Sequence, residues 1–255
     1  MQHSSNIMKF FTLALLASGA SAFAPVSQQT SGTQLMSARS DLEDLAKASN
    51  PTLNYYDPLS LAEADFWGEG EDATIGFLRH AEVKHGRVAM FAFVGYCVQS
   101  NFVWPWAMTQ AGDSFPSADL SPEAQWDAIP EGAKTQIFTV IAALEIWDEC
   151  SGGSGSHYMR GRQAGKYPAF TLFRDNVHWV MDLYDPFGFN KKMSQEKKDK
   201  RLVMEVNNGR LAMIGIFGFM AADCVPGSVP ALANIAQPYD GDIMAPFAAN
   251  FHLFN

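Results

Sequence analysis

Two short segments of the chain carry acidic, basic and metal-ligating residue types at matching positions. The first is Glu82-Val-Lys-His85-Gly-Arg87 and the second is Glu205-Val-Asn-Asn208-Gly-Arg210. Carboxylate, imidazole and amide groups are ligands for divalent cations such as Mg²⁺, and Glu and Arg form ion pairs. The two segments therefore have the residues both to hold a metal-containing group and to join two parts of the chain.

The similarity of the two segments extends beyond these residues. At an offset of 123 residues, seven residues of the first copy recur in the second: Glu82, Val83, Gly86, Arg87, Ala89, Met90 and Gly95 match Glu205, Val206, Gly209, Arg210, Ala212, Met213 and Gly218. A repeat at this spacing is too long for a solenoid and indicates two related elements that pack with pseudo-symmetry.

Helix geometry predicts how the charges pair. In a helix, each Glu lies on nearly the same face as the residue three positions later, whereas its own Arg is turned away by about 140°. If the two helices cross, Arg210 reaches Glu82 and Arg87 reaches Glu205. The repeats also supply small residues that let two helix backbones approach closely, namely Gly86, Ala89, Gly209 and Ala212.

Three apolar runs supply the helices that would carry these segments, at 88–98, 137–147 and 211–222. Each run is shorter than the roughly 20 residues that a membrane span needs. The first and third extend as helices towards the N-terminus, because the preceding residues are good helix formers without Pro. The extension brings charged residues towards the bilayer, which is costly unless they are paired or coordinated. The expected spans are about 74–99, 133–149 and 202–222.

Loop charges favour the same three spans and orient them. Residues 100–133 and 223–255 contain no Lys or Arg, whereas ten lie between the second and third runs: Arg160, Arg162, Lys166, Arg174, Lys191, Lys192, Lys197, Lys198, Lys200 and Arg201. This alternation follows the positive-inside rule and places the second loop on the inner side of the membrane, which is the stromal side if the membrane is a thylakoid.

Composition excludes several functions. The net charge of −9 and the pI near 5.1 argue against a nucleic-acid partner. Three cysteines without paired spacing indicate neither a disulfide framework nor a zinc site. We find no hydrolase, nucleotide-binding or dinucleotide-binding motif, so we expect no enzyme activity and no small-molecule substrate.

The N-terminus has the composition of a targeting sequence. Residues 1–22 have the layout of a cleavable signal peptide, and residues 23–40 that of a transit peptide. The junction Ala20-Ser-Ala-Phe23-Ala-Pro25 resembles the bipartite presequence of plastids acquired by secondary endosymbiosis; an ordinary secreted protein is the alternative. The folded domain is then expected over 41–255.

The two copies together resemble the motifs of the chlorophyll-binding light-harvesting antenna superfamily. The stretch Ala81-Glu-Val-Lys-His85-Gly-Arg87-Val-Ala-Met90 is most similar to the red-lineage branch, the fucoxanthin chlorophyll a/c binding proteins. The resemblance implies an all-α membrane protein with three transmembrane helices. In such a protein the first and third helices cross by pseudo-twofold symmetry, and short amphipathic helices accompany them.

The resemblance also implies axial ligands for the magnesium of chlorophyll, with no separate metal site. Glu82 and Glu205 would each give one carboxylate oxygen, while the opposite Arg holds the other. His85 and Asn208 would bind two further chlorophylls as neutral donors. The alternative for His85 is a hydrogen-bonded interface histidine, and for Asn208 a hydrogen bond between helices.

Three further residues are weaker candidates. Gln136 and Glu145 resemble the ligands of the middle helix, but nine residues place them on opposite helix faces, so each is either a ligand or structural. His178 lies in a stretch, 173–184, that is expected to form a short interfacial helix. It either binds pigment or is simply a polar residue at the interface.

The implied function is a light-harvesting antenna. It would bind chlorophyll a, chlorophyll c and a fucoxanthin-like or other carotenoid in the thylakoid membrane of a secondary red-lineage plastid. The implied partners are thylakoid lipids, other antenna subunits and a photosystem core, to which excitation energy passes. The alternatives are a photoprotective member of the superfamily that dissipates excitation and, from another class, an ion or proton transporter, which would need unpaired ionisable groups along a cavity.

Overall fold

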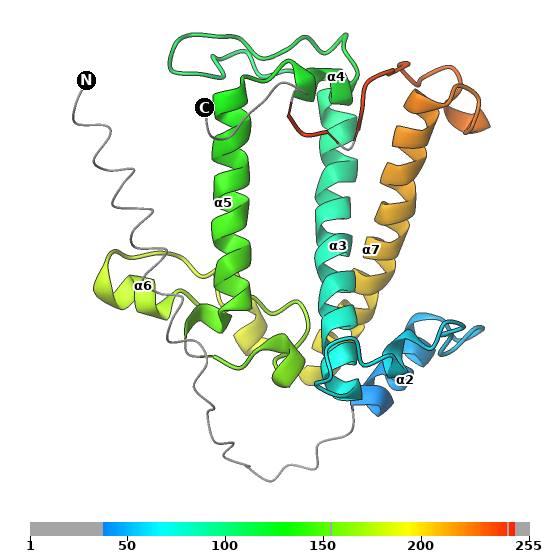
Figure 1. Ribbon diagram of the computed structural model, residues 1–255, viewed down its shortest axis with the longest axis vertical. Coiled ribbons are helices and arrows are strands. Elements are labelled where there is room, and N and C mark those ends of the chain that lie inside the picture. Colours follow the sequence, from blue (N-terminus) through cyan, green and yellow to red (C-terminus); the bar gives the residue numbers. More distant parts are fainter. Residues whose placement is uncertain (1–37, 154, 244, 248–255) are drawn as a thin grey trace. The chain divides into compact units, whose positions relative to one another are not determined.

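The structure is a computed structural model that describes residues 38–153, 155–243 and 245–247 (Figure 1). The expected signal peptide, and all but the last residues of the expected transit segment, lie outside this part of the chain. Within it, regular structure is helical apart from one isolated bridge between Ala107 and Ser114. The prediction of an all-helical fold is therefore confirmed.

The α-helices follow one another along the chain with irregular segments between them. They are α2 (Ala38–Ser49), α3 (Glu71–Gln99), α4 (Pro122–Asp127), α5 (Glu131–Glu149), α6 (Thr171–Asn176) and α7 (Gln195–Cys224). Short 3₁₀ turns lie at Leu61–Glu63, Ser151–Gly153, Tyr158–Arg160, Phe189–Lys192 and Pro230–Leu232.

The three long helices α3, α5 and α7 cover the three stretches that were expected to cross a membrane. In the part of the chain that the structure describes, no helix combines the length and the apolar character needed for a membrane crossing.

Local sequence accounts for where the long helices begin and end. Glu71 and Asp72 occupy the first turn of α3, where negative charge interacts favourably with the positive end of the helix dipole. Pro130 precedes α5, and α7 ends at Cys224, just before Val225 turns to extended backbone ahead of Pro226. Proline disfavours helical backbone in the residue before it, so α7 cannot continue.

The helices α3 and α7 cross with their backbones in contact at Gly86 and Gly209. A Cβ atom built on Gly86 would lie 3.0 Å from the Cα of Gly209, and one built on Gly209 would lie 2.9 Å from the Cα of Gly86. Val83 and Val206, three residues before each glycine, are both buried. Only glycine permits this approach, so the two positions fix the separation of the helices.

Aromatic rings fill the space between α3 and α7 on the C-terminal side of the crossing. Phe219 stacks on Phe93 and on Tyr96, with ring centroids 4.9 Å apart in both pairs. Phe91 and Phe217 instead point outward and are 83% and 73% exposed. The two helices therefore pack one row of half-buried aromatic side chains against each other and present another row to the surroundings.

Two local features differ from expectation. The helix α2 was not expected, and in it Arg39 forms ion pairs with Glu43, Glu63 and Glu71. The helix expected over 173–184 is wrong in its bounds, because α6 spans only Thr171–Asn176. The following chain folds back, since the Asp182 carboxylate accepts hydrogen bonds from the Phe170 amide and from Arg174.

The glycine contact predicts a large difference between two pairs of alanine substitutions. Gly86→Ala or Gly209→Ala places a methyl group against backbone and should lower the free energy of unfolding by about 1–3 kcal/mol, as overpacking does. Gly95 and Gly218, which also correspond in the two helices, have open space at Cβ. Gly95→Ala and Gly218→Ala should be neutral or gain up to about 1 kcal/mol from helix propensity. Thermal unfolding followed by circular dichroism measures both pairs, and equal losses would contradict the close approach.

Candidate functional site

Glutamates and arginines from the two copies pair across the crossing of α3 and α7. The Arg210 guanidinium lies on Glu82 Oε1, with Nη2 at 2.7 Å and Nε at 2.8 Å. Arg87 Nε lies 2.6 Å from Glu205 Oε1. Each helix thus neutralises the carboxylate of the other, and opposite charges flank the glycine contact.

Glu82 has a second partner that the sequence analysis missed. Arg79 Nη1 lies 2.6 Å from Glu82 Oε2, and the Arg79 side chain is 13% exposed. The signal was present, because residues three apart lie on one face of a helix. Among the described contacts, the Oε2 atom of Glu205 has no partner of this kind, so the two carboxylates differ.

His85 and Asn208 both point away from the crossing. Both residues are exposed, and His85 Nδ1 lies 2.8 Å from the carbonyl oxygen of Ala81. A carbonyl only accepts, so Nδ1 carries the proton and Nε2 presents a free lone pair to the outside. The Asn208 side chain makes no hydrogen bond among the contacts of the described residues. Both side chains are available as neutral donors to an external ligand.

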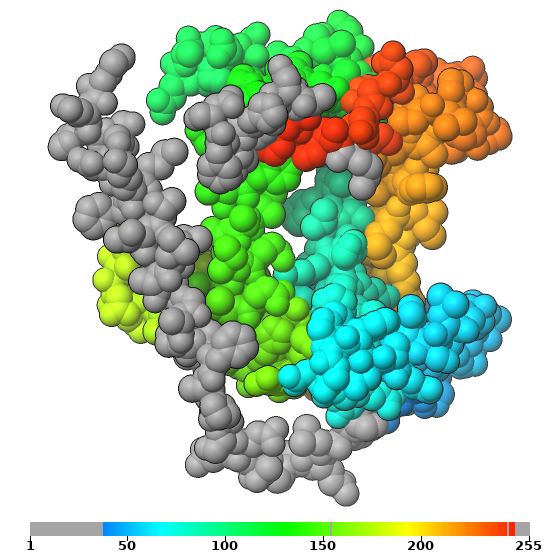
Figure 2. All heavy atoms as spheres, viewed as in Figure 1, coloured from blue at the N-terminus to red at the C-terminus, as the bar shows by residue number. Residues whose placement is uncertain are grey.

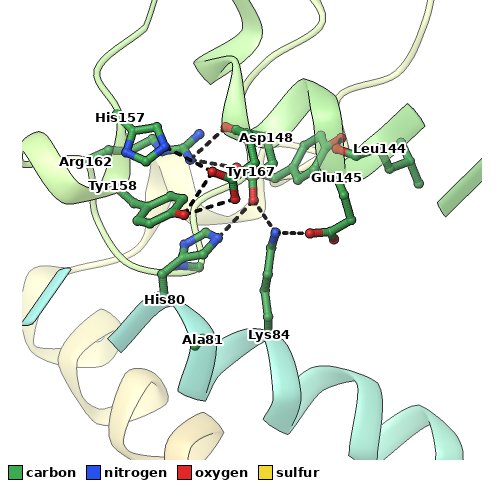
Figure 3. Close-up of polar contacts among 12 residues, drawn as sticks. His80, Ala81, Lys84, Leu144, Glu145, Asp148, His157, Tyr158, Arg162 and Tyr167 are labelled. Carbon is green, nitrogen blue, oxygen red and sulfur yellow. Dashed lines mark hydrogen bonds and ion pairs between the residues drawn. The ribbon is translucent and has the colours of Figure 1, made fainter. Parts of the chain in front are cut away.

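A buried polar cluster joins α3 to α5 at the end where the second loop lies (Figure 3). Its centre is Asp148, which is 0% exposed. Its Oδ2 atom lies 2.9 Å from His80 Nε2 and 2.7 Å from Lys84 Nζ, and its Oδ1 atom lies 2.6 Å from Arg162 Nη2. The His80 ring stacks on Tyr158 with centroids 4.1 Å apart. A buried carboxylate requires such compensation, so the cluster fixes α5 against α3.

The candidate residues of α5 have different surroundings. Glu145 Oε2 lies 2.6 Å from Lys84 Nζ, which ties Glu145 to α3 and leaves its other oxygen unengaged among the described contacts. Gln136 is exposed near the opposite end of α5. The structure therefore brings Glu145, but not Gln136, into the polar cluster.

His178 lies beyond the end of α6 and is exposed. Its Nδ1 atom lies 3.0 Å from the carbonyl oxygen of Trp179, which again leaves Nε2 as the free acceptor.

Gly165 connects the polar cluster to the crossing. Its amide donates to His80 Nδ1 at 3.2 Å, and its carbonyl accepts from Arg87, the residue that holds Glu205. Gly165 has φ +73°, and a Cβ atom there would collide with Val83 Cγ1 and lie 3.1 Å from Arg87 Nη2. A single loop residue therefore positions groups of both networks.

The donor atoms that point outward indicate which kind of metal-containing group these residues could hold. In the described part of the chain, no cluster of three or more His, Cys, Asp or Glu side chains could hold a metal ion. The outward donors instead stand singly: a carboxylate oxygen, an imidazole nitrogen and an amide oxygen. A single protein donor suffices for a metal ion whose other positions are filled by its own organic ligand, so the arrangement suits axial ligation.

Comparison with known proteins agrees with this chemistry. The chain matches the family described as chlorophyll A-B binding protein over residues 41–224. A chloroplastic fucoxanthin-chlorophyll a-c binding protein of Trieres chinensis is 33% identical over 236 residues, which cover 89% of this chain and 100% of the relative.

Two further relatives have the same description. Fucoxanthin-chlorophyll a-c binding protein F of Phaeodactylum tricornutum is 32% identical over 216 residues, covering 84% of this chain and 94% of the relative. Protein F of Macrocystis pyrifera is 31% identical over 206 residues, covering 79% and 84%.

The position of Gly165 predicts a substitution effect larger than backbone strain alone. Gly161→Ala is the matched control, because Gly161 also has positive φ, +98°, but open space at Cβ. The control should cost about 1–2 kcal/mol of unfolding free energy, the price of left-handed backbone. Gly165→Ala should cost clearly more, because it also displaces Val83 and Arg87. Thermal unfolding measures both variants, and equal costs would show that Gly165 does not position the two networks.

Proposed function

Because the chain belongs to the chlorophyll A-B binding protein family, we propose that it binds chlorophyll a, chlorophyll c and a carotenoid and serves as a light-harvesting antenna of the plastid. The names of its relatives, fucoxanthin-chlorophyll a-c binding proteins of the chloroplast, support this pigment set. The observation that carries the proposal is the crossing of α3 and α7, where paired charges hold the helices and single donors face outward.

Four residues are proposed as axial ligands of chlorophyll magnesium. Glu205 offers Oε2, because Arg87 holds Oε1. Glu82 offers a lone pair of a carboxylate that Arg210 and Arg79 hold in place. His85 offers Nε2 and Asn208 its amide oxygen, and neither has to break a contact among the described residues to do so.

Gln136, Glu145 and His178 are proposed as further pigment positions. Gln136 and His178 are exposed with a free acceptor atom, which supports ligation. Glu145 has one oxygen on Lys84, in the same way that Glu205 has one on Arg87. This likeness supports Glu145 as a ligand of the same type.

We propose that α3, α5 and α7 cross the thylakoid membrane at about 74–99, 133–149 and 202–222, with α3 and α7 related by a pseudo-twofold axis. The cross-paired charges support this placement, since paired ionisable groups are the kind that a bilayer tolerates. Large apolar side chains on the outer faces also support it, such as Leu211 and Ile214, which are 70% and 71% exposed. These faces would contact lipids, pigments and other antenna subunits.

The space around the helices supports pigment binding. Figure 2 shows the molecule hollowed between α5 and α3. A separate apolar hollow of about 440 Å³ lies along the C-terminal end of α3. It is lined by Phe93, Val94, Cys97, Val98, Asn101 and Phe102. Flat macrocycles and extended carotenoids need apolar surfaces of this kind.

The proposed activity makes and breaks no bonds. Bound chlorophyll and carotenoid supply the electronic excitation, and this chain fixes their positions and orientations so that energy passes on to a photosystem core. The α3–α7 crossing and the Asp148 cluster are suited to this, because both hold helices rigidly. An ion transporter would need unpaired ionisable groups, and the charges at the crossing are paired: Glu82 with Arg210 and Glu205 with Arg87. They give no support to ion transport.

Residues 1–22 and 23–40 are proposed as the signal peptide and the transit segment, and 41–255 as the pigment-binding domain. The chloroplastic location of the relatives supports a plastid address.

Refolding the chain with pigments in mild detergent tests the proposal. We expect bound chlorophyll a, chlorophyll c and carotenoid, and we expect light absorbed by the carotenoid to emerge as chlorophyll a fluorescence. His85→Leu should lose one chlorophyll per chain with little change in thermal stability, because its side chain is exposed. Arg87→Leu should lose chlorophyll and stability together, because it leaves Glu205 without an ion-pair partner.

Gln163→Leu serves as the control, since Gln163 is exposed in the second loop and its side chain makes no hydrogen bond among the described residues. Pigment analysis per polypeptide and thermal unfolding give the two readouts. A stably folded wild type that binds no pigment would overturn the proposal, and equal damage from His85→Leu and Arg87→Leu would contradict the division between ligand and ion pair.

One observation favours the photoprotective alternative as a second candidate. Glu123 of α4 lies beside the C-terminal ends of α3 and α7, where its Oε2 atom lies 3.4 Å from the Tyr96 hydroxyl. The same hydroxyl donates to Asp223. Burial, and secondly the charge of Asp223, raise the pKa of Glu123 above its usual value of 4.5. Under the proposed topology this carboxyl faces the lumen, where the pH falls in the light.

The raised pKa of Glu123 predicts a pH dependence with a definite sign. The folded chain binds this proton more tightly than the unfolded chain, so its contribution to stability is complete below pH 4.5 and is lost as pH rises through the folded-state pKa. Glu123→Gln should therefore be more stable than wild type at neutral pH and less sensitive to pH above 4.5. Thermal unfolding across this range measures it, with the exposed Asp240→Asn as control. Parallel curves for wild type and Glu123→Gln would remove the support for a pH-dependent role.

A further inference from the structure

The two halves of the duplicated motif are unequal at one position. Arg79 stands three residues before Glu82, and at the offset of 123 residues its counterpart is Leu202, three residues before Glu205. Arg79 donates to Glu82 Oε2 at 2.6 Å, whereas Leu202 has nothing to donate. Glu82 therefore has a second guanidinium partner, whereas among the described residues Glu205 has only the one from Arg87.

The arginines from the opposite helices increase this difference. Arg210 directs both Nε and Nη2 at Glu82 Oε1. Arg87 gives Nε to Glu205 and another nitrogen to the carbonyl oxygen of Gly165. Glu82 thus lies between two guanidinium groups and its surroundings carry a net positive charge, while Glu205 and Arg87 form a neutral pair.

A carboxylate that accepts more charged hydrogen bonds is a weaker donor to a metal, because each donor withdraws electron density from the oxygens. Groups outside the metal's own ligands change metal affinity, typically by about 10–100-fold. Here the withdrawal of electron density sets the direction of the change, and the affinity of Glu82 for the metal falls. Arg79 also brings a charge close to whatever the carboxylate binds, and its side chain is only 13% exposed, so solvent screens it weakly.

We propose that Arg79 sets the ligand strength of Glu82 and thereby makes the two carboxylate pigment positions unequal. The chlorophyll at Glu82 is bound less tightly than the one at Glu205, and the excess positive charge displaces its absorption band. Arg79 acts through Glu82 and is a positioning residue. The inference rests on the proposed function.

Reciprocal substitutions test the inference in the pigment-loaded chain. Arg79→Leu gives the first copy the residue of the second, and Leu202→Arg does the reverse. Difference spectra of Glu82→Leu and Glu205→Leu, which remove the donor atom, against wild type first identify the band of each chlorophyll. The rate at which each chlorophyll leaves in detergent, and the position of its band, are then measured in the two variants and in Arg79→Lys.

Arg79→Leu should slow release from Glu82 by about tenfold and shift only that band, because Arg210 still neutralises the carboxylate. Leu202→Arg should speed release from Glu205 and leave Glu82 unchanged, and this arm stands even if Arg79→Leu fails to fold. Arg79→Lys keeps the charge and should retain the wild-type rate and band.

Unchanged or faster release from Glu82 in Arg79→Leu would overturn the inference, as would an unchanged Glu205 chlorophyll in Leu202→Arg. Failure of the proposed function has a different signature. In that case the wild type binds no pigment, or Glu82→Leu and Glu205→Leu both retain every chlorophyll.

Discussion

The contact between Gly86 and Gly209 determines the distance on which the other interactions of α3 and α7 depend. With the backbones this close, the side chains of Arg87 and Arg210 are long enough to reach the carboxylates of the opposite helix. A wider crossing would separate these charges, leaving Glu205 without an ion-pair partner and Glu82 with Arg79 alone. The ion pairs therefore depend on the glycine contact, because close packing of the helices makes charge neutralisation possible.

The Asp148 cluster joins α5 to α3, as the glycine contact joins α7 to α3. Here polar side chains make the contact between helices, and the loop that follows α5 supplies Arg162 and Gly165 to complete it. Because Gly165 also holds Arg87, α5 is linked to the ion pairs at the crossing through one loop. The helix α3 is thus joined to α7 at the glycine crossing and through the aromatic rings beyond it, and to α5 at the Asp148 cluster.

The sequence predicted the features that arise from periodicity and from the repeat. Three helices, the close approach of small residues and the pairing of Arg87 and Arg210 with the glutamate of the opposite helix all follow from spacing along a helix. Asp148 was missed because its partners, His80 and Arg162, come from distant segments and share no spacing with it. The fold-back after α6 was also missed, since Asp182 holds it by contacts to Phe170 and Arg174 that compete with helix propensity. Arg79 could have been found, because it lies one helical turn before Glu82.

The ion pairs at the crossing also constrain the order in which the chain acquires its structure. Arg87 and Glu205 are 118 residues apart in the sequence, and Glu82 and Arg210 are 128 apart. Contacts of such long sequence separation form slowly, because a long loop must close first. During synthesis, α3 emerges with Arg87 lacking its carboxylate until α7 has followed, although Arg79 already accompanies Glu82. Closure of the crossing is thus a late step of biogenesis, and a nascent chain that stops short of α7 has no means of completing it.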